Sequence, residues 1–349
     1  MLHCSKTEAR MTPNDFPGFV FQAVEDAYAF WLPPAPRSPV PVPVSTAQPV
    51  GAPHAVAAGT FLPSTFTNAL GSRDYKLYVP SGVHDAPMPL VVMLHGCRQD
   101  PDDFAAGTRM NQLAQRHGFL VAYPAQKARS NGANCWNWFE TQEQTRAGQE
   151  PSLIAGIVGA IGAQHRVDPA RVFVAGLSAG ASMAVILGQT HPELFAAVAA
   201  HSGVPLGSAH DVASAFAAMQ GQMPPPKARS ASRRAARPVR TLVLHGDADR
   251  TVEWANGRAI TQDAIAAFKR AKAPVLLSRR TGAAGRPSPQ GTRNFVDAGG
   301  RVMVRECTVH GGSHAWFGGS TEGSFTEHAG LDASAEIVRF FLGAALEDS

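Results

Sequence analysis

The feature that most constrains the fold of this 349-residue chain is a serine flanked by glycines, placed between two apolar runs. The segment Gly176–Gly180 has the pattern G-x-S-x-G. Residues 171–175 before it predict a buried β-branched strand, and residues 181–189 after it predict a helix. A strand, a sharp turn and a helix form the setting in which this pattern presents a nucleophile, and the glycines let the two backbones approach closely. Ser178 is therefore the candidate nucleophile.

Partners for this serine follow later strands in the order that such a site requires. Residues 241–246 predict a buried strand, and Asp249 lies in the loop after it. Residues 301–309 predict another strand, and His314 lies in the next loop. The order serine, aspartate, histidine is that of an α/β-hydrolase triad, in which histidine is the base and aspartate fixes its tautomer. These loops should meet at the carboxyl edge of one parallel sheet.

Each partner has a competitor close by in the sequence. Asp247 also follows the strand over 241–246, but Asp249 is favoured because it lies deeper in the loop. His310 competes with His314, and the Gly311-Gly312 pair between them favours His314 at the loop tip. The other histidines that follow strands are expected to orient loops rather than act as the base: His95, His201 and His245.

Acyl transfer also needs backbone N–H donors for the oxyanion that develops in the transition state. One donor should come from the residue after the nucleophile, which is Ala179. The second should come from the loop after the apolar strand over 90–94, where the sequence is His95-Gly96-Cys97. Cys97 N–H is the candidate.

Composition and charge exclude several other classes of protein. The net charge is +4, but the basic residues concentrate over 227–240 without interleaved aromatic residues, so we expect no nucleic-acid partner. The chain has no run of 18 apolar residues, so no membrane span is expected. It has neither a phosphate-binding glycine loop nor a metal-ligand constellation, so no cofactor and no metal are expected. The expected partner is an ester substrate, and the sequence leaves the oligomeric state open.

The order of predicted elements indicates one α/β catalytic domain over 59–349, with a mostly parallel sheet and helices on both faces. A proline-rich extension over 1–58, with a short helix over 16–32, precedes it. An insertion or small cap is expected over 204–238. Further strands are predicted over 75–80, 90–94, 119–123 and 196–200, and further helices over 102–117, 153–165, 254–271 and 333–346.

Together these motifs resemble the poly(3-hydroxybutyrate) depolymerase family of esterases, whose relatives include feruloyl and acetylxylan esterases. The resemblance covers about residues 70–345. It implies an α/β-hydrolase fold and a serine esterase, and it assigns the nucleophile to Ser178, the acid to Asp249, the base to His314 and an oxyanion donor to Cys97. Two positions depart from the pattern: Ser313 replaces a glycine and Phe317 replaces a proline. The segments that carry the resemblance are Leu94–Cys97, Cys135–Phe139, Asp168–Val172, Gly176–Gly180 and Gly312–Trp316.

The resemblance also implies a disulfide between Cys97 and Cys135, which would tie the oxyanion loop to a loop rich in aromatic residues. Trp136 and Trp138 in that loop form either a wall of the substrate site or a satellite of the core. Trp316, two residues after His314, belongs to the same candidate wall.

The sequence thus predicts a carboxylic ester hydrolase that acts through an acyl-enzyme on Ser178. The expected substrates are short-chain poly- or oligo(3-hydroxyalkanoate) esters. A carbohydrate esterase that releases feruloyl or acetyl groups is the first alternative, and a non-catalytic binding relative is the second. The resemblance favours an extracellular protein, but the first residues do not match a secretory signal, so a cytoplasmic location is the alternative.

Overall fold

The computed structural model describes residues 59–82, 86–128, 130–222, 237–278, 290–328 and 330–343. The predicted extension over 1–58, with its helix over 16–32, lies outside the described residues, as do residues 227–236 of the basic stretch over 227–240. Along the described ranges, no helix is long and apolar enough to cross a membrane.

The described residues form one large sheet with the strand order β1-β2-β4-β3-β5-β6-β7-β10-β9-β8. Its centre, from β4 to β10, is parallel, and antiparallel pairs extend it at both edges. The sheet is therefore mostly parallel, as predicted. The strands are β1 (Thr60–Asn68), β2 (Gly71–Val79), β3 (Met88–Leu94), β4 (Leu120–Pro124), β5 (Val167–Leu177), β6 (Ala197–His201), β7 (Arg240–Gly246), β8 (Leu276–Ser278), β9 (Gln290–Val296) and β10 (Val302–Val309).

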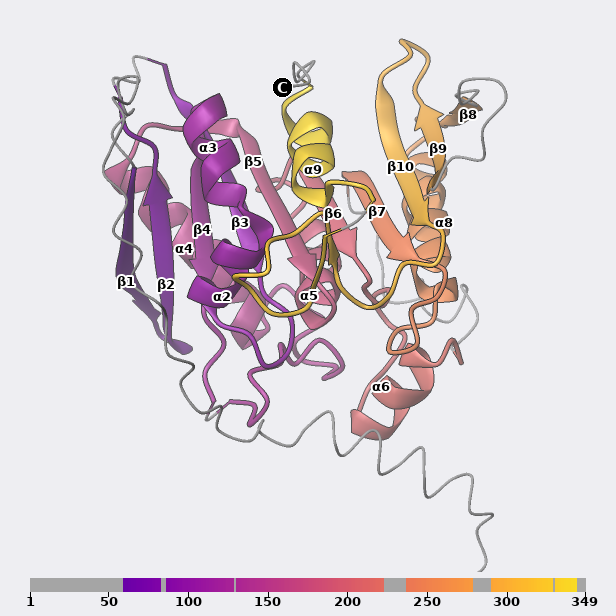
Figure 1. Cartoon of the computed structure of the whole chain (residues 1–349), viewed down its shortest axis with the longest axis horizontal. Coiled ribbons are helices and arrows are strands. Elements are labelled where there is room, and N and C mark those ends of the chain that lie inside the picture. Colours follow the sequence, from indigo (N-terminus) through magenta and orange to yellow (C-terminus); the bar gives the residue numbers. More distant parts are fainter. Residues whose placement is uncertain are drawn as a thin grey trace, which may run out of the picture. The chain divides into compact units, whose positions relative to one another are not determined.

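Helices cover both faces of this sheet. In Figure 1, α2, α3 and α9 lie in front of the strands, and α4, α5 and α8 lie behind them. Because both faces are covered, the central strands are apolar without alternation, and every residue of β3, β4 and β6 is buried. The helices are α2 (Pro101–Thr108), α3 (Met110–His117), α4 (Gln149–Gln164), α5 (Ala179–Thr190), α6 (Val212–Met219), α8 (Ala255–Arg270) and α9 (Ala333–Leu342).

Two parts of the architecture differ from the sequence prediction. The helix expected over 102–117 is two helices, because Arg109 between them has a left-handed backbone (φ 52°) and its N–H donates to Ala105 O. The edge strands β1, β8 and β9 were not predicted. β1 and β8 are mostly exposed and β9 is mainly half-buried, so none of them carries the continuous apolar run of a central strand.

The region expected to form an insertion or cap, 204–238, is described only in part. It contains α6, which begins with a capping box between Asp211 and Ser214. Figure 1 shows α6 beyond the lower edge of the sheet. Glu253 N–H donates to Met219 O at 2.7 Å, so the carboxyl end of α6 is joined to the chain just after Asp249. That a cap is formed here stays a prediction.

Candidate active site

Ser178 lies at the turn between β5 and α5 with an unusual backbone, φ 56° and ψ −118°. Its neighbours explain why the flanking positions are glycines. A Cβ on Gly176 would lie 2.4 Å from the Gly180 carbonyl, and a Cβ on Gly180 would lie 2.1 Å from Leu94 O. Such distances leave no room for a side chain, so the pattern G-x-S-x-G is what this sharp turn requires. A strained serine at the carboxyl edge of a parallel sheet is typical of a nucleophile.

The structure pairs Asp249 with His314, as the sequence predicts. His314 Nδ1 lies 2.7 Å from Asp249 Oδ2, and the two side chains are 10% and 0% exposed. The other carboxylate oxygen, Asp249 Oδ1, accepts hydrogen bonds from the backbone N–H groups of Thr251 and Val252 at 2.9 and 2.8 Å. These bonds fix the orientation of the carboxylate. A buried carboxylate on Nδ1 leaves Nε2 of the imidazole to act as the base.

Burial alone would raise the pKa of the Asp249 carboxyl. Hydrogen bonds from His245 and His314 and the backbone N–H of Val252 outweigh that effect, so the pKa is lowered from its ordinary value. Asp249 is therefore an anion at neutral pH. This is the charge state needed to stabilise an imidazolium on His314.

The competing residues form a second pair at the surface. His310 Nδ1 lies 2.8 Å from Asp247 Oδ2, with side-chain exposures of 57% and 33%. Asp247 Oδ1 accepts the N–H of Gly311 at 2.7 Å. Asp247 therefore holds the start of the loop after β10, whereas Asp249 binds His314 at the tip of that loop.

The end of β6 connects the three loops that carry the candidate triad. His201 O accepts the N–H of Ser178 at 2.9 Å, and His201 Nε2 accepts the N–H of Phe317 at 3.3 Å. The next residue, Ser202, donates its N–H to Leu244 O at 2.9 Å, just before the loop of Asp249. These bonds hold the loops that carry Ser178, Asp249 and His314 against the same strand end.

The other histidines that follow strands make contacts with loop backbone. His95 Nδ1 lies 2.8 Å from Gly96 O, and its Nε2 accepts the N–H of Gln126 at 3.1 Å. His245 Nε2 lies 2.8 Å from Val252 O. Burial lowers the pKa of His95 to about 4 and, together with His245 and His314, lowers the pKa of His201 well below its ordinary value. The rings of His95 and His201 are therefore neutral at pH 7.

The candidate oxyanion donors lie on a tightly held loop and at a helix start. Cys97 N–H has no hydrogen-bond acceptor among the residues the structure describes. Ala179 is the first residue of α5, where N–H groups have no acceptor within the helix. The disulfide implied by the family resemblance is present between Cys97 and Cys135. It joins the Cys97 loop to the aromatic loop that follows β4.

The tryptophans occupy positions that differ from the expected substrate wall. Trp136 is 0% exposed and donates Nε1–H to His95 O at 3.0 Å. Trp316 is 1% exposed, donates Nε1–H to Ser334 Oγ at 3.0 Å and stacks on His201. Both rings are enclosed by protein with their N–H groups satisfied, so they belong to the core behind the site and do not form its wall. Trp138, at 7% exposed, is the member that stays a proposed substrate contact.

A buried polar cluster behind the Cys135 loop was not found by sequence reasoning. Glu150 of α4 accepts hydrogen bonds from Asn137 and Gln126, and Arg73 of β2 lies beside it. The one signal in the sequence was an acidic residue at the start of an apolar helix. Its partners are far apart in the chain, so their pattern could not be recognised.

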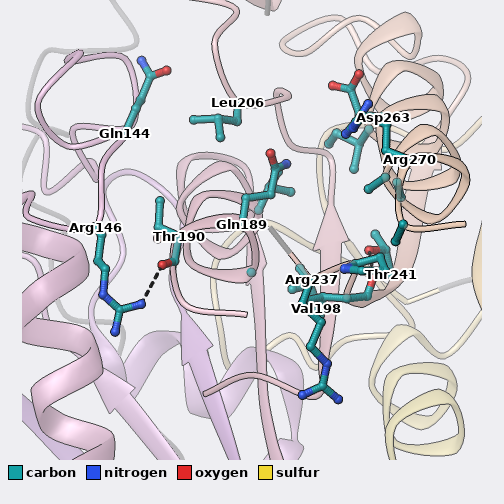
Figure 2. A pocket seen from close by; sticks show the side chains of 18 of the residues that line it. Gln144, Arg146, Gln189, Thr190, Val198, Leu206, Arg237, Thr241, Asp263 and Arg270 are labelled. Carbon is teal, nitrogen blue, oxygen red and sulfur yellow. Dashed lines mark hydrogen bonds between the residues drawn. The ribbon is translucent and has the colours of Figure 1, made fainter. Parts of the chain in front are cut away.

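A cavity of about 620 Å³ lies apart from this site. Figure 2 shows Gln189 and Thr190, from the last turn of α5, on its wall with Asp263 and Arg270 of α8. Ser178 stands before the first turn of α5, about 15 Å away along the helix. The residues of the candidate triad do not line this cavity, and the triad lies at the other end of the helix. Among the described residues, no group of three or more His, Cys, Asp or Glu side chains could hold a metal ion.

The strand order, the nucleophile turn and the Asp–His pair together define an α/β-hydrolase. Residues 73–283 match the family model "Esterase PHB depolymerase". The chain belongs to this family.

Relatives of known name agree with this assignment. The chain is 40% identical over 156 residues to poly(3-hydroxyalkanoate) depolymerase C of Paucimonas lemoignei, covering 45% of this chain and 37% of that protein. It is 34% identical over 142 residues to a probable acetylxylan esterase A of Aspergillus fumigatus, covering 40% and 37%. Feruloyl esterase B of Neurospora crassa is 34% identical over 139 residues, covering 40% and 46%. The chain therefore matches less than half the length of each of these relatives.

A solved structure supports the fold. The acetyl xylan esterase from Aspergillus awamori superposes with a TM-score of 0.61 at 19% identity, covering 81% of this chain and all of that one. At this identity the likeness establishes the architecture alone.

Proposed function

We propose that this protein is a serine esterase that cleaves carboxylic esters through an acyl-enzyme on Ser178. The observation that carries the proposal is the buried Asp249–His314 pair, held by the same strand end as the strained Ser178 turn. Membership of an esterase family supports the same reaction.

In the proposed mechanism, His314 Nε2 takes the hydroxyl proton as Ser178 Oγ attacks the ester carbonyl carbon. The N–H groups of Cys97 and Ala179 stabilise the oxyanion, and the anionic Asp249 stabilises the imidazolium. His314 then returns the proton to the leaving alcohol. Water, activated by the same histidine, hydrolyses the acyl-enzyme and regenerates Ser178.

We infer that the substrates are short-chain poly- or oligo(3-hydroxyalkanoate) esters. The similarity to a poly(3-hydroxyalkanoate) depolymerase, at 40% identity, supports this choice. Similarity to acetylxylan and feruloyl esterases, at 34% identity, favours a carbohydrate esterase as the second candidate. Hydrolysis rates for hydroxybutyrate oligomers, acetylated xylan and feruloyl sugars, measured side by side, decide between them. A higher kcat/KM on either sugar ester would reverse the preference.

The nucleophile is tested by Ser178→Ala, which removes one hydroxyl. Turnover of p-nitrophenyl butyrate should fall by at least about 10³-fold, because the triad cannot act without its nucleophile. Ser208→Ala is the matched control. Ser208 is also buried, and its hydroxyl has no hydrogen-bond partner among the described residues. Turnover by the Ser208→Ala variant should therefore stay within about threefold of wild type. Retention of more than about a thousandth of the wild-type rate in Ser178→Ala would refute the assignment.

A further inference from the structure

The loop that carries Cys97 makes four connections to one other part of the chain, Gln126 and residues 133–137. Gln126 N–H donates to His95 Nε2 at 3.1 Å, and Trp136 Nε1–H donates to His95 O at 3.0 Å. Arg98 N–H donates to Ala133 O at 2.7 Å. The disulfide from Cys97 to Cys135 is the fourth connection. The position of the Cys97 N–H therefore depends in part on where Gln126 and residues 133–137 lie, while Gln99 joins the other side of the loop to Asp103 and Ser324.

One buried carboxylate, Glu150, contacts both ends of that segment, and Arg73 and Ser72 also hold its start. Glu150 Oε2 accepts the backbone N–H of Asn137 at 2.9 Å, and Glu150 Oε1 accepts its Nδ2–H at 3.0 Å. Glu150 Oε1 also accepts a hydrogen bond from Gln126 Nε2, which donates to Cys135 O at 2.8 Å as well. Glu150 is 1% exposed. Its two oxygens thus fix both sides of the disulfide-bonded Cys135.

The surroundings of Glu150 act on its pKa in opposite directions. Burial raises the pKa of Glu150 from its ordinary value of 4.5 to about 7, against the hydrogen bond from Gln126 and the charge of Arg73. Arg73 Nη2 lies 3.9 Å away, and the buried Glu143 accepts the N–H of Glu150 at 2.7 Å. Nonpolar residues of the same volume often stabilise a fold as well as a buried ionic group does, so stability alone does not account for a charged side chain at this position.

We propose that Glu150 is a positioning residue for the oxyanion donor: it fixes the Gln126–Asn137 segment, and this segment fixes the backbone N–H of Cys97. The proposal rests on the esterase function above. Glu150→Gln replaces one carboxylate oxygen with an –NH₂ group, which cannot accept a hydrogen bond. One N–H group that now donates to Glu150 then faces another donor, so the segment must shift. A shift of the Cys97 N–H weakens transition-state stabilisation more than substrate binding.

The test compares kcat and KM for p-nitrophenyl butyrate, with active sites counted by titration with a fluorophosphonate. Glu150→Gln should lower kcat per titrated serine by about 30-fold with KM within about twofold, which is less than the loss of a whole oxyanion donor. Binding of butylboronic acid, a mimic of the tetrahedral oxyanion, should weaken by a similar factor. A merely structural glutamate would reduce the amount of folded enzyme, and it would leave both quantities per titrated serine unchanged.

Two further variants keep the test decisive. Glu336→Gln alters another buried carboxylate, which pairs with Arg305 and Arg339 on the far side of the sheet from α4, and it should leave kcat per titrated serine unchanged. Trp136→Phe removes the hydrogen bond to His95 O together with one ring of a fully buried side chain, and it should lower kcat about fivefold at constant KM, even if Glu150→Gln does not fold.

The outcomes separate this inference from the proposed function. A wild-type protein that neither hydrolyses the ester nor reacts with the fluorophosphonate contradicts both. A wild type that does both, with Glu150→Gln and Trp136→Phe equal to it in kcat per titrated serine and in boronate affinity, overturns the positioning role alone. If only Glu150→Gln fails to fold, the kcat of Trp136→Phe decides the question.

Discussion

Two aspartate–histidine pairs join the same two loops, and they differ mainly in their surroundings. The Nδ1 to Oδ2 distances are nearly equal, 2.7 Å for His314–Asp249 and 2.8 Å for His310–Asp247. The first pair is almost completely buried, and the second is largely exposed. Water and salt weaken an exposed pair, whereas a buried carboxylate keeps its hydrogen bonds and holds one imidazole tautomer. Burial, and not bond length, therefore distinguishes the proposed catalytic pair from the surface pair that holds the start of the loop after β10.

The largest expected difference between the pairs lies in the histidines. His314→Ala should lower kcat by about 10⁶-fold, as the loss of a catalytic base does in a serine hydrolase. His310→Ala removes one end of a surface hydrogen bond and should change kcat by less than about threefold. Steady-state hydrolysis of p-nitrophenyl butyrate by both variants measures this. Comparable losses in the two variants would mean that both pairs take part in the reaction.

A smaller difference should appear in stability and its pH dependence. Asp249→Ala leaves the half-buried N–H of Thr251 and the buried N–H of Val252 without their acceptor and should lower the free energy of unfolding by about 3 kcal/mol. Asp247→Ala should lower it by less than about 1 kcal/mol. Urea unfolding monitored by tryptophan fluorescence measures both values. Equal values would show that the burial of Asp249 contributes nothing beyond what the exposed pair does.

The sign of the pH effect follows from the pKa of Asp249. This pKa is lowered in the folded protein, with burial opposing and the hydrogen bonds from His245 and His314 producing the shift. The stability that Asp249 contributes is therefore present above the ordinary aspartate pKa and is lost as the pH falls through the lower, folded-state value. The difference in unfolding free energy between wild type and Asp249→Ala should shrink in acid. A difference that grows on acidification would contradict the anionic assignment.

The elements that the sequence predicts well are those whose chemistry is local. The Ser178 turn requires glycine at 176 and 180 because backbone atoms occupy the space of a Cβ, so the motif is visible in five residues. The strand order then brings the loops after β5, β7 and β10 to one edge. The pairing of Asp249 with His314 follows from loop length and order.

The features that the sequence does not reveal depend on contacts between distant segments. The Glu150 cluster joins Arg73, Gln126, Asn137 and α4, and no spacing rule relates these positions. The burial of Trp316 depends on His201 and Ser334, so its place two residues after the candidate base gives no sign that its ring faces the core. Mostly exposed strands such as β1 bury too few apolar residues to show a period.

The central claim, that the buried pair is the catalytic one, is tested most directly by exchanging one oxygen for nitrogen in each aspartate. Asp249→Asn and Asp247→Asn are nearly isosteric with the wild type, so kcat/KM for p-nitrophenyl butyrate reports the role of each carboxylate. The account predicts a loss on the order of 10⁴-fold for Asp249→Asn and less than about threefold for Asp247→Asn. The opposite ranking would contradict it and would transfer the role of the acid to Asp247.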